Sequence, residues 1–208
     1  DCLKSAYSLA KGKNLSLSSS FTKSVSEQVL KNLPKEVIAL GCEPDLSVYS
    51  GSVKILNIDG SKHFKRYCGG HIHLGIGRSI DDTVESFLER SKTTFHDHAD
   101  EMVRLFDYLV GNTFVMLDHN EENVERRKVY GQAGSYRKQR HGIEYRVLSN
   151  FWLQHSSLVS LVFLLGRLSA KMTQPTTNAY EIARLGSFTK EVPEKDVENA
   201  INFNDFNL

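Results

Sequence analysis

The chain has 208 residues and a mass of 23.5 kDa, enough for one domain with a sizeable core. Its 26 Lys and Arg against 25 Asp and Glu give a net charge of +1, so overall charge indicates neither a nucleic-acid partner nor an anionic membrane surface. The longest apolar stretch, residues 158–165, is too short to span a bilayer. Three widely spaced cysteines indicate reduced thiols rather than a disulfide framework. We therefore expect a single cytoplasmic domain over residues 1–208.

The N-terminal part of the chain alternates short helical and extended patterns. Apolar spacing predicts helices over residues 3–11 and 25–33, the second ended by Pro34. Alternating or β-prone patterns predict extended segments at residues 15–21, 37–40, 46–49, 53–58 and 71–77. Asp59-Gly60 is a hairpin signal. Residues 45–75 are therefore expected to form antiparallel sheet.

From residue 81 onward the pattern becomes helical. Apolar residues at helical spacing predict one long helix over residues 81–117, packed on the sheet. Gly131, Gly134 and Gly142 predict a flexible loop before a strand over residues 143–148. Further helices are predicted at residues 151–172, 180–185 and 194–201. The side chains expected to be mostly buried are Tyr7, Phe21, Trp152, Leu153, Val159 and Phe163.

The segment Gly69-Gly70-His71-Ile72-His73 is the first candidate for chemistry. In a strand, His71 and His73 point to the same face, so two imidazoles converge as metal ligands do. The two glycines allow close approach of the backbone to a ligand or to another strand. A glycine bulge with two hydrogen-bonded histidines explains the same motif, and the motif alone does not separate the two interpretations.

The second candidate is the glycine-rich segment from Tyr130 to Arg137, followed by Glu144 and Arg146. Glu144 and Arg146 share one strand face and offer a carboxylate for a divalent cation beside a guanidinium for phosphate. Arg137 adds a second guanidinium. A structural salt bridge is the competing interpretation of an isolated Glu-x-Arg. Together the two segments supply metal ligands, arginines and flexible glycines, as phosphoryl transfer to a carboxylate requires.

The order GGHIHLG, long helix, RRKVYGQAGSYR and GIEYRVLSNFWL resembles the phage-type carboxylate-amine ligases, or amidoligases, of the glutamine synthetase and glutamate-cysteine ligase superfamily. The resemblance runs from about residue 40 to residue 153. It implies an α+β, glutamine synthetase-like catalytic domain with a curved antiparallel sheet and helices on its convex face. It also implies ATP and Mg²⁺ as cofactors, and an acyl-phosphate intermediate that an amine attacks.

The resemblance also implies roles for residues that match the family motifs. His71 and Glu144 would contact the metal. Period-two spacing, rather than the resemblance, adds His73, Glu43 and Asp45 as further metal ligands. We expect His71, Glu144 and at least one of Glu43 and Asp45 to lie on one face of the sheet. Arg137 and Arg146 would act on phosphate as catalytic residues together with Tyr136. The residues that would bind substrate or phosphate are His71, Arg126, Arg127, Tyr130, Gly134 and Ser135.

One departure from the superfamily pattern concerns its early strand with two acidic metal ligands. That strand is not clearly present, so we expect this sequence to be the later part of the domain, with the metal-binding strand upstream of Asp1. ATP turnover by residues 1–208 alone is expected to be undetectable. Its partners would be a small-molecule or peptide carboxylate and an amine, with a homo-oligomer or virion proteins as further possibilities.

Two other functions compete with the ligase. The first is a non-catalytic structural or virion-associated binding module derived from the same fold, which loss of the acidic strand would favour. The second is a metal-dependent hydrolase built on His71, His73 and Glu144. The hydrolase gives no role to Arg137 and Arg146, and it ranks last.

Overall fold

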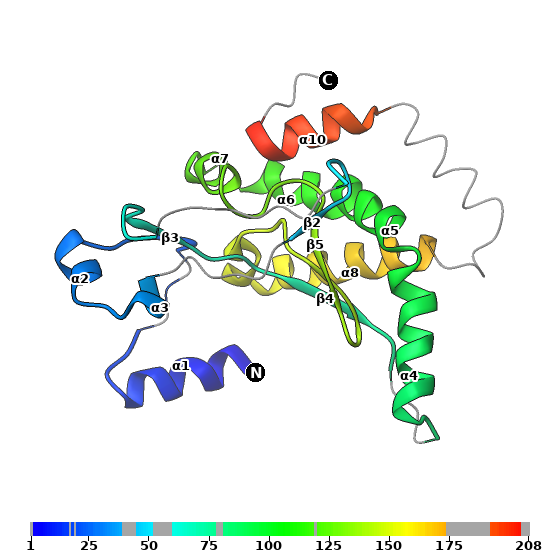
Figure 1. Cartoon of the computed structure of the whole chain (residues 1–208), viewed down its shortest axis with the longest axis horizontal. Helices are drawn as coiled ribbons and strands as arrows, with labels where there is room; N and C mark the ends of the chain where they lie inside the picture. The colour runs from blue at the N-terminus through cyan, green and yellow to red at the C-terminus, as the bar shows by residue number, and fades with distance from the viewer. Residues whose placement is uncertain are drawn as a thin grey trace.

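The chain folds into a mixed α+β structure with antiparallel sheets, shown in Figure 1 as a computed structural model. The residues that the structure describes are 2–16, 18, 20–38, 45–51, 60–77, 81–118, 120–173 and 192–204. The predicted strand over residues 53–58, the hairpin signal at residues 59–60 and the predicted helix over residues 180–185 lie wholly or partly outside them.

A four-stranded sheet forms the centre of the molecule. Its strands are β2 (Leu46–Ser47), β5 (Ser135–Gln139), β6 (Gly142–Tyr145) and β4 (Ile72–Gly75), in the order β2-β5-β6-β4. All three pairings are antiparallel. The prediction that residues 45–75 form the sheet among themselves was wrong over the residues described, because β2 and β4 lie at opposite edges and pair with β5 and β6. The prediction of a flexible loop before residue 143 was wrong at residues 135–139, which pair with β6 in a tight hairpin. Tyr136 explains this, because its ring enters the core and its exposed fraction is only 4%.

The N-terminal part forms a smaller unit with its own two-stranded sheet. β1 (Thr22–Ser24) pairs with β3 (Lys65–Tyr67), and three helices flank it: α1 (Cys2–Gly12), α2 (Glu27–Lys31) and α3 (Lys35–Ile38). The predicted strands at residues 15–21 and 37–40 were wrong over the residues described. Pro34 accounts for the second error, because its carbonyl accepts the Val37 and Ile38 amide hydrogens and begins α3.

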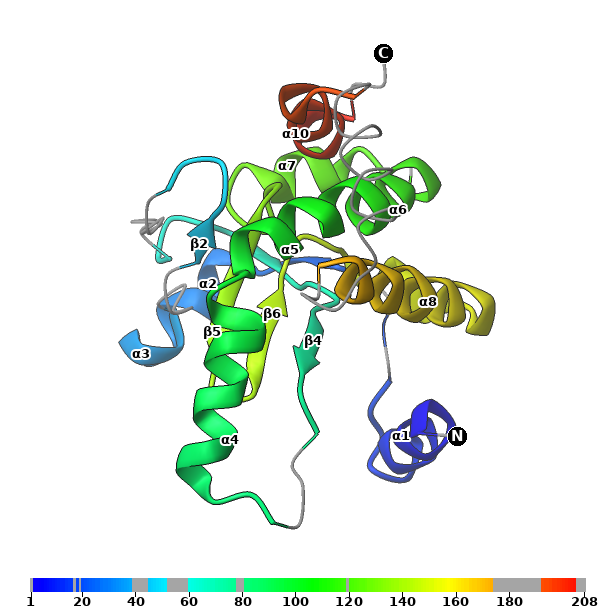
Figure 2. The same cartoon turned by 90° about the vertical axis from the view of Figure 1, so that its right-hand side faces the viewer.

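One long helical run covers a face of the four-stranded sheet, as predicted. Its parts are α4 (Val84–Ser91), η1 (Lys92–His96), α5 (Ala99–Phe106), η2 (Asp107–Gly111) and α6 (Asn112–Leu117). The segments η1 and η2 are single π turns, in which Asp97 and Asn112 donate to carbonyls five residues earlier. Figure 2 shows the run rising past the sheet. The rings of Phe106 and Tyr145 join the two layers, with centroids 5.1 Å apart.

The remaining helices surround this core. They are α7 (Glu122–Arg127), the 3₁₀ helix η3 (Asn150–Gln154), α8 (Ser156–Met172) and α10 (Glu194–Phe203). Only one side of α8 is buried, where Val162 and Gly166 face α5. Of the side chains predicted to be buried, Phe21 and Trp152 are buried and Val159 is half-buried. The prediction was wrong for three others, which are exposed: Tyr7, Leu153 and Phe163. Over the residues described, none of the helices combines the length and apolarity needed to cross a bilayer.

Candidate active site on the polar face of the sheet

The strand register divides the four-stranded sheet into an apolar and a polar face. Ile72, Ile143 and Tyr145 point toward the helical run and are almost completely buried. The alternate residues point the other way. Extending the printed registers by one residue gives two rows across the four strands, which are Asp45, Arg137, Glu144, His73 and Ser47, Ser135, Arg146, His71. Two candidate segments far apart in sequence therefore lie on one face.

Ion pairs connect the carboxylates and guanidiniums of these rows. Asp45 Oδ1 lies 2.9 Å from Arg137 Nε and 2.9 Å from Arg146 Nε. Arg146 Nη1 also donates to Glu144 Oε1, and Gln139 Nε2 donates to Glu144 Oε2 at 2.9 Å. Burial alone would raise the pKa of Glu144, but Arg146, Gln139 and His71 together outweigh it and hold that pKa below its usual value. Glu144 is therefore ionised at neutral pH.

His71 and Tyr130 extend this network toward the glycine-rich segment. His71 Nδ1 lies 2.7 Å from Glu144 Oε1, and His71 Nε2 contacts the Tyr130 hydroxyl, which accepts from Arg146 Nη2 at 2.9 Å. Burial and then the positive charge of Arg146 lower the pKa of His71 to about 4. The ring is neutral at pH 7. Both ring nitrogens of His71 have a hydrogen-bond partner when Nδ1–H donates to Glu144 and Nε2 accepts from Tyr130.

Three predicted site residues lie away from this cluster. Tyr136 points to the apolar face, where its hydroxyl donates to Asp100 Oδ1 at 2.9 Å. Arg126 is fully buried and donates to the Val147 carbonyl at 2.6 Å, and burial lowers its pKa to about 9. Arg127 is buried as well and donates to Asn204 Oδ1 at 2.9 Å. None of the three side chains takes part in the ion pairs of the polar face.

Gly134 connects the glycine-rich segment to the apolar face. Its φ of +72° and its contact with Val48 leave no room for a Cβ, which would lie 2.7 Å from Val48 Cγ2. Its N–H donates to Asp107 Oδ2 at 2.6 Å, and Asp107 Oδ1 accepts from the Tyr145 hydroxyl at 2.6 Å. The Gly134 amide is therefore already hydrogen-bonded. Burial raises the pKa of Asp107 to about 7, despite the hydrogen bonds it receives.

The predicted metal ligands divide between two places. Asp45, His71 and Glu144 lie in the ion-pair network, whereas His73 is exposed and its Nδ1 faces His141 Nε2. Glu43 lies outside the described residues. Mg²⁺ requires near-octahedral oxygen coordination. Within the described part of the chain no group of three or more His, Cys, Asp or Glu is placed to hold a metal ion, and Asp45 and Glu144 already bind arginines. These residues, as arranged, do not fit Mg²⁺.

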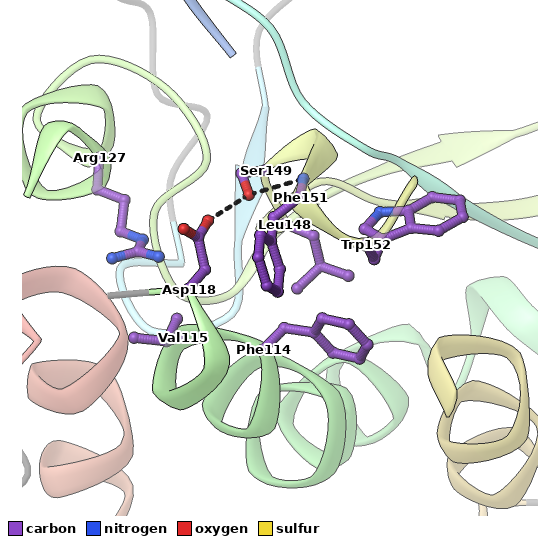
Figure 3. Close-up of a pocket in the computed structure, with 8 residues that line it drawn as sticks. All are labelled: Phe114, Val115, Asp118, Arg127, Leu148, Ser149, Phe151 and Trp152. Carbon is purple, nitrogen blue, oxygen red and sulfur yellow. Dashed lines mark hydrogen bonds between the residues drawn. The ribbon is translucent and has the colours of Figure 1, made fainter. Parts of the chain in front are cut away.

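A small hollow lies elsewhere, between α6, α7 and η3. Figure 3 shows the residues that line it, which are Phe114, Val115, Asp118, Arg127, Leu148, Ser149, Phe151 and Trp152. Asp118 accepts there from Ser149 Oγ at 2.7 Å and from Asn123 Nδ2. The hollow encloses space for only about one water molecule, so it is no nucleotide site.

Four residues that lie on the polar face or contact the candidate site residues were not predicted from the sequence. Ser47 and Gln139 lie on the polar face, Asp107 anchors Gly134, and His141 faces His73. The spacing of two between Asp45 and Ser47 was a usable signal for a shared strand face. Gln139 has the same spacing of two from Arg137, which would have been usable had β5 been recognised as a strand. Asp107 and His141 depend on contacts distant in sequence, which periodicity does not predict.

Residues 96–185 match a family of carboxylate-amine ligases. The family that matches them is described as Phage phiEco32-like COOH.NH2 ligase-type 2, and the match confirms the resemblance predicted from the sequence. It covers less than half of the chain. The match includes Arg137, Glu144 and Arg146, whereas Asp45 and His71 lie before it. No curated protein and no solved structure matches the chain significantly.

Proposed function

We propose that the polar face of the four-stranded sheet is the active site of an ATP-dependent ligase that joins a carboxylate to an amine, in a domain of glutamine synthetase-like architecture. The observation that carries the proposal is the gathering of Arg137, Arg146, Glu144 and Asp45 on one face, supplied by three strands. The family match supports the class of reaction. We place this reaction in the cytoplasm, because it would draw on ATP.

The reaction would take place in two steps. A carboxylate oxygen of the first substrate attacks the γ-phosphorus of ATP, and ADP leaves. The amine then attacks the acyl carbon, inorganic phosphate leaves, and the amine loses a proton. Arg137 and Arg146 would stabilise the negative charge on the transferred phosphoryl group, a contribution that oriented cations make without reorganising during the step.

Arg137 is better placed than Arg146 to leave its protein partner for a phosphate. The Arg137 side chain is 14% exposed against 3% for Arg146. Asp45 contacts both guanidiniums, so it stays paired with Arg146 when Arg137 turns away. We therefore assign phosphate contact first to Arg137, and a fixed electrostatic role to Arg146.

The neutral His71 would complete the site as a hydrogen-bonding group. Its imidazole connects Glu144 to the Tyr130 hydroxyl, which also accepts from Arg146. A substrate carboxylate that displaced the Tyr130 hydroxyl would meet the same Arg146 nitrogen. Tyr130 and Arg146 are thus the residues that we propose for orienting the substrate.

A non-catalytic binding module is the second candidate, and one observation favours it. Both arginines already bind carboxylates of the protein itself, as in a structural salt-bridge network. A binding module would keep these pairs whether nucleotide is present or not. A ligase must exchange at least one of them for phosphate.

The test is release of phosphate from ATP by the purified protein with a panel of amino acids and amines. Arg137→Ala is expected to lower the rate roughly a hundredfold, the loss typical of removing one donor to transition-state charge. Arg140→Ala is the matched control, because Arg140 is exposed in the turn of the same hairpin. Titration of Mg²⁺ in the same assay tests the cation dependence implied by the family.

Two results would separate the candidates. Full activity of Arg137→Ala would remove this residue from the mechanism. Absence of turnover by the full-length protein with every substrate pair, in the presence of Mg²⁺ and with the protein folded, would favour the binding module.

A further inference from the structure

A pair of histidines at one end of the sheet lies outside the ion-pair network. His73 lies on β4, and His141 lies in the turn that joins β5 to β6. His73 Nδ1 is 3.3 Å from His141 Nε2, and the ring centroids are 5.4 Å apart with an angle of 31° between the planes. The two nitrogens that face each other come from segments 68 positions apart in the chain.

The separation is long for a hydrogen bond and suitable for a shared metal ion. N–H donors usually approach their acceptors to about 2.7–3.2 Å. Imidazole nitrogens bind zinc-like ions at about 2.0–2.1 Å, and two nitrogens 3.3 Å apart would then subtend about 105° at the ion. That angle lies close to the tetrahedral value. The pair needs little movement to become a two-ligand chelate.

The surroundings leave this pair accessible. His73 is exposed and His141 is half-buried. The nearby His96 is already engaged, because its Nε2 lies 2.9 Å from the carbonyl oxygens of both Gln139 and Gly142. Glu144 is opposite His73 in the strand register, but its carboxylate is held by Arg146 and Gln139. Water would therefore fill the remaining coordination positions.

We propose that His73 and His141 form a binding site for a divalent transition-metal ion of the Ni²⁺, Cu²⁺ and Zn²⁺ group. Imidazole suits these ions, whereas Mg²⁺ prefers oxygen ligands. The bound ion joins the edge strand β4 to the β5–β6 turn. It thereby fixes the hairpin that carries Arg137 and Glu144. The site is separate from the ligase chemistry, and it does not rest on the proposed function.

The experiment is calorimetric titration of the protein, freed of any histidine tag, with Ni²⁺, Zn²⁺ and Mg²⁺ at neutral pH. One Ni²⁺ or Zn²⁺ per chain is expected to bind, and Mg²⁺ is not expected to displace it. His73→Ala and His141→Ala are each expected to weaken binding by about tenfold or more, since each removes a ligand. His98→Ala, at the start of α5, is the matched control and is expected to bind as the parent protein does.

Two additional measurements keep the result decisive. His73→Gln retains a polar side chain, and circular dichroism of each variant shows whether it is folded. Binding in the parent protein is expected to weaken as the pH falls, because protons compete with the metal ion for imidazole nitrogens. The proposal is overturned if the parent protein binds no Ni²⁺ or Zn²⁺ at millimolar concentration, or if folded His73 and His141 variants bind as tightly as the His98→Ala control.

Discussion

The two faces of the four-stranded sheet each bury a carboxylate, in opposite ways. On the polar face, Glu144 lies against Arg146, and its pKa is held below the usual value. On the apolar face, Asp107 is fully buried, receives hydrogen bonds from Tyr145 and Gly134, and has its pKa raised to about 7 by burial. The two pKa values shift in opposite directions because the Arg146 guanidinium lies against Glu144, whereas burial dominates at Asp107.

This contrast gives the two carboxylates different functions. Glu144 is charged at neutral pH and holds the Arg146 guanidinium in place on the polar face. Asp107 accepts the Gly134 amide from the glycine-rich segment and the Tyr145 hydroxyl from β6, and so anchors both from behind. The chemistry is expected on one face, and the residues that fix its geometry lie on the other.

The largest loss of stability is expected from replacing Arg146, the more buried of the two arginines on the polar face. Arg146→Met keeps most of the side-chain volume but leaves Glu144 and Asp45 without their shared guanidinium. Breaking a buried ion pair at one partner typically costs about 3–5 kcal/mol of unfolding free energy. Urea denaturation measures the loss.

Arg137→Met is the matched control for that variant. Arg137 is more exposed, and Asp45 keeps Arg146 as a partner when Arg137 is lost. The expected cost is about 1 kcal/mol, near the value for partly solvated pairs. Equal losses in the two variants would mean that burial does not distinguish these arginines.

The next effect concerns Asp107 and the pH dependence of stability. Its folded pKa of about 7 lies above the ordinary value of 3.8, so the folded protein retains a proton that the unfolded chain has lost between these values. The unfolding free energy is therefore expected to fall by on the order of 2–4 kcal/mol as pH rises from about 4 to 7. Asp107→Asn should remove this slope. A slope unchanged in Asp107→Asn would show that Asp107 is ionised throughout.

His71 is expected to give a smaller slope of opposite sign. Its pKa is lowered from 6.5 to about 4, so the unfolded chain binds a proton that the folded protein does not. Stability present above pH 6.5 should be lost as pH falls toward 4, by on the order of 1–2 kcal/mol for this partly exposed ring. Comparison of His71→Gln with the parent protein by thermal unfolding across this range isolates the contribution. Identical pH profiles would contradict the assignment of a neutral His71.

The smallest effect is expected at Tyr136. Tyr136→Phe removes one hydrogen bond to Asp100, worth about 0.5–1.5 kcal/mol, from the face opposite the ion pairs. If chemistry is confined to the polar face, phosphate release should stay within about twofold of the parent rate. A large loss of activity at full stability would return Tyr136 to the catalytic residues.

The long helices and several strands could be predicted because their signals are local, whereas the pairing of β2 with β5 and of β4 with β6 joins segments far apart in the chain. Apolar residues at helical spacing identified the run over residues 81–117, and period-two patterns identified β2, β4 and β6. The strand β5 was missed because glycines on either side of it suggested a loop. Exposure of Phe163 was missed because apolarity alone does not say which side of α8 faces α5.

The site was partly predictable for a related reason. Period-two spacing correctly indicated that Glu144 and Arg146 share a face, and the prediction that His71 and Asp45 lie on this face with Glu144 is confirmed. The contact of His73 with His141 depends on a turn 68 residues away, which the sequence did not indicate. Nor could the sequence indicate that Tyr136 and Arg137, which are adjacent, serve opposite faces unless β5 was recognised as a strand.

The π turn η2 has a consequence for how the chain tolerates insertions and deletions. A π turn holds one residue more than a regular α-helical turn, and Asp107 is the first residue of this one. Deleting a single residue between 108 and 111 would restore regular helical hydrogen bonding. Because the extra residue is contained within this one turn, its removal would leave α5 and α6 with nearly the same faces toward the sheet. Gly111 has no room for a side chain, because a Cβ there would lie 2.7 Å from the Tyr145 hydroxyl and 2.8 Å from Ile201 Cδ1. The deletion is therefore expected to be tolerated only if a glycine stays at that point of the helix.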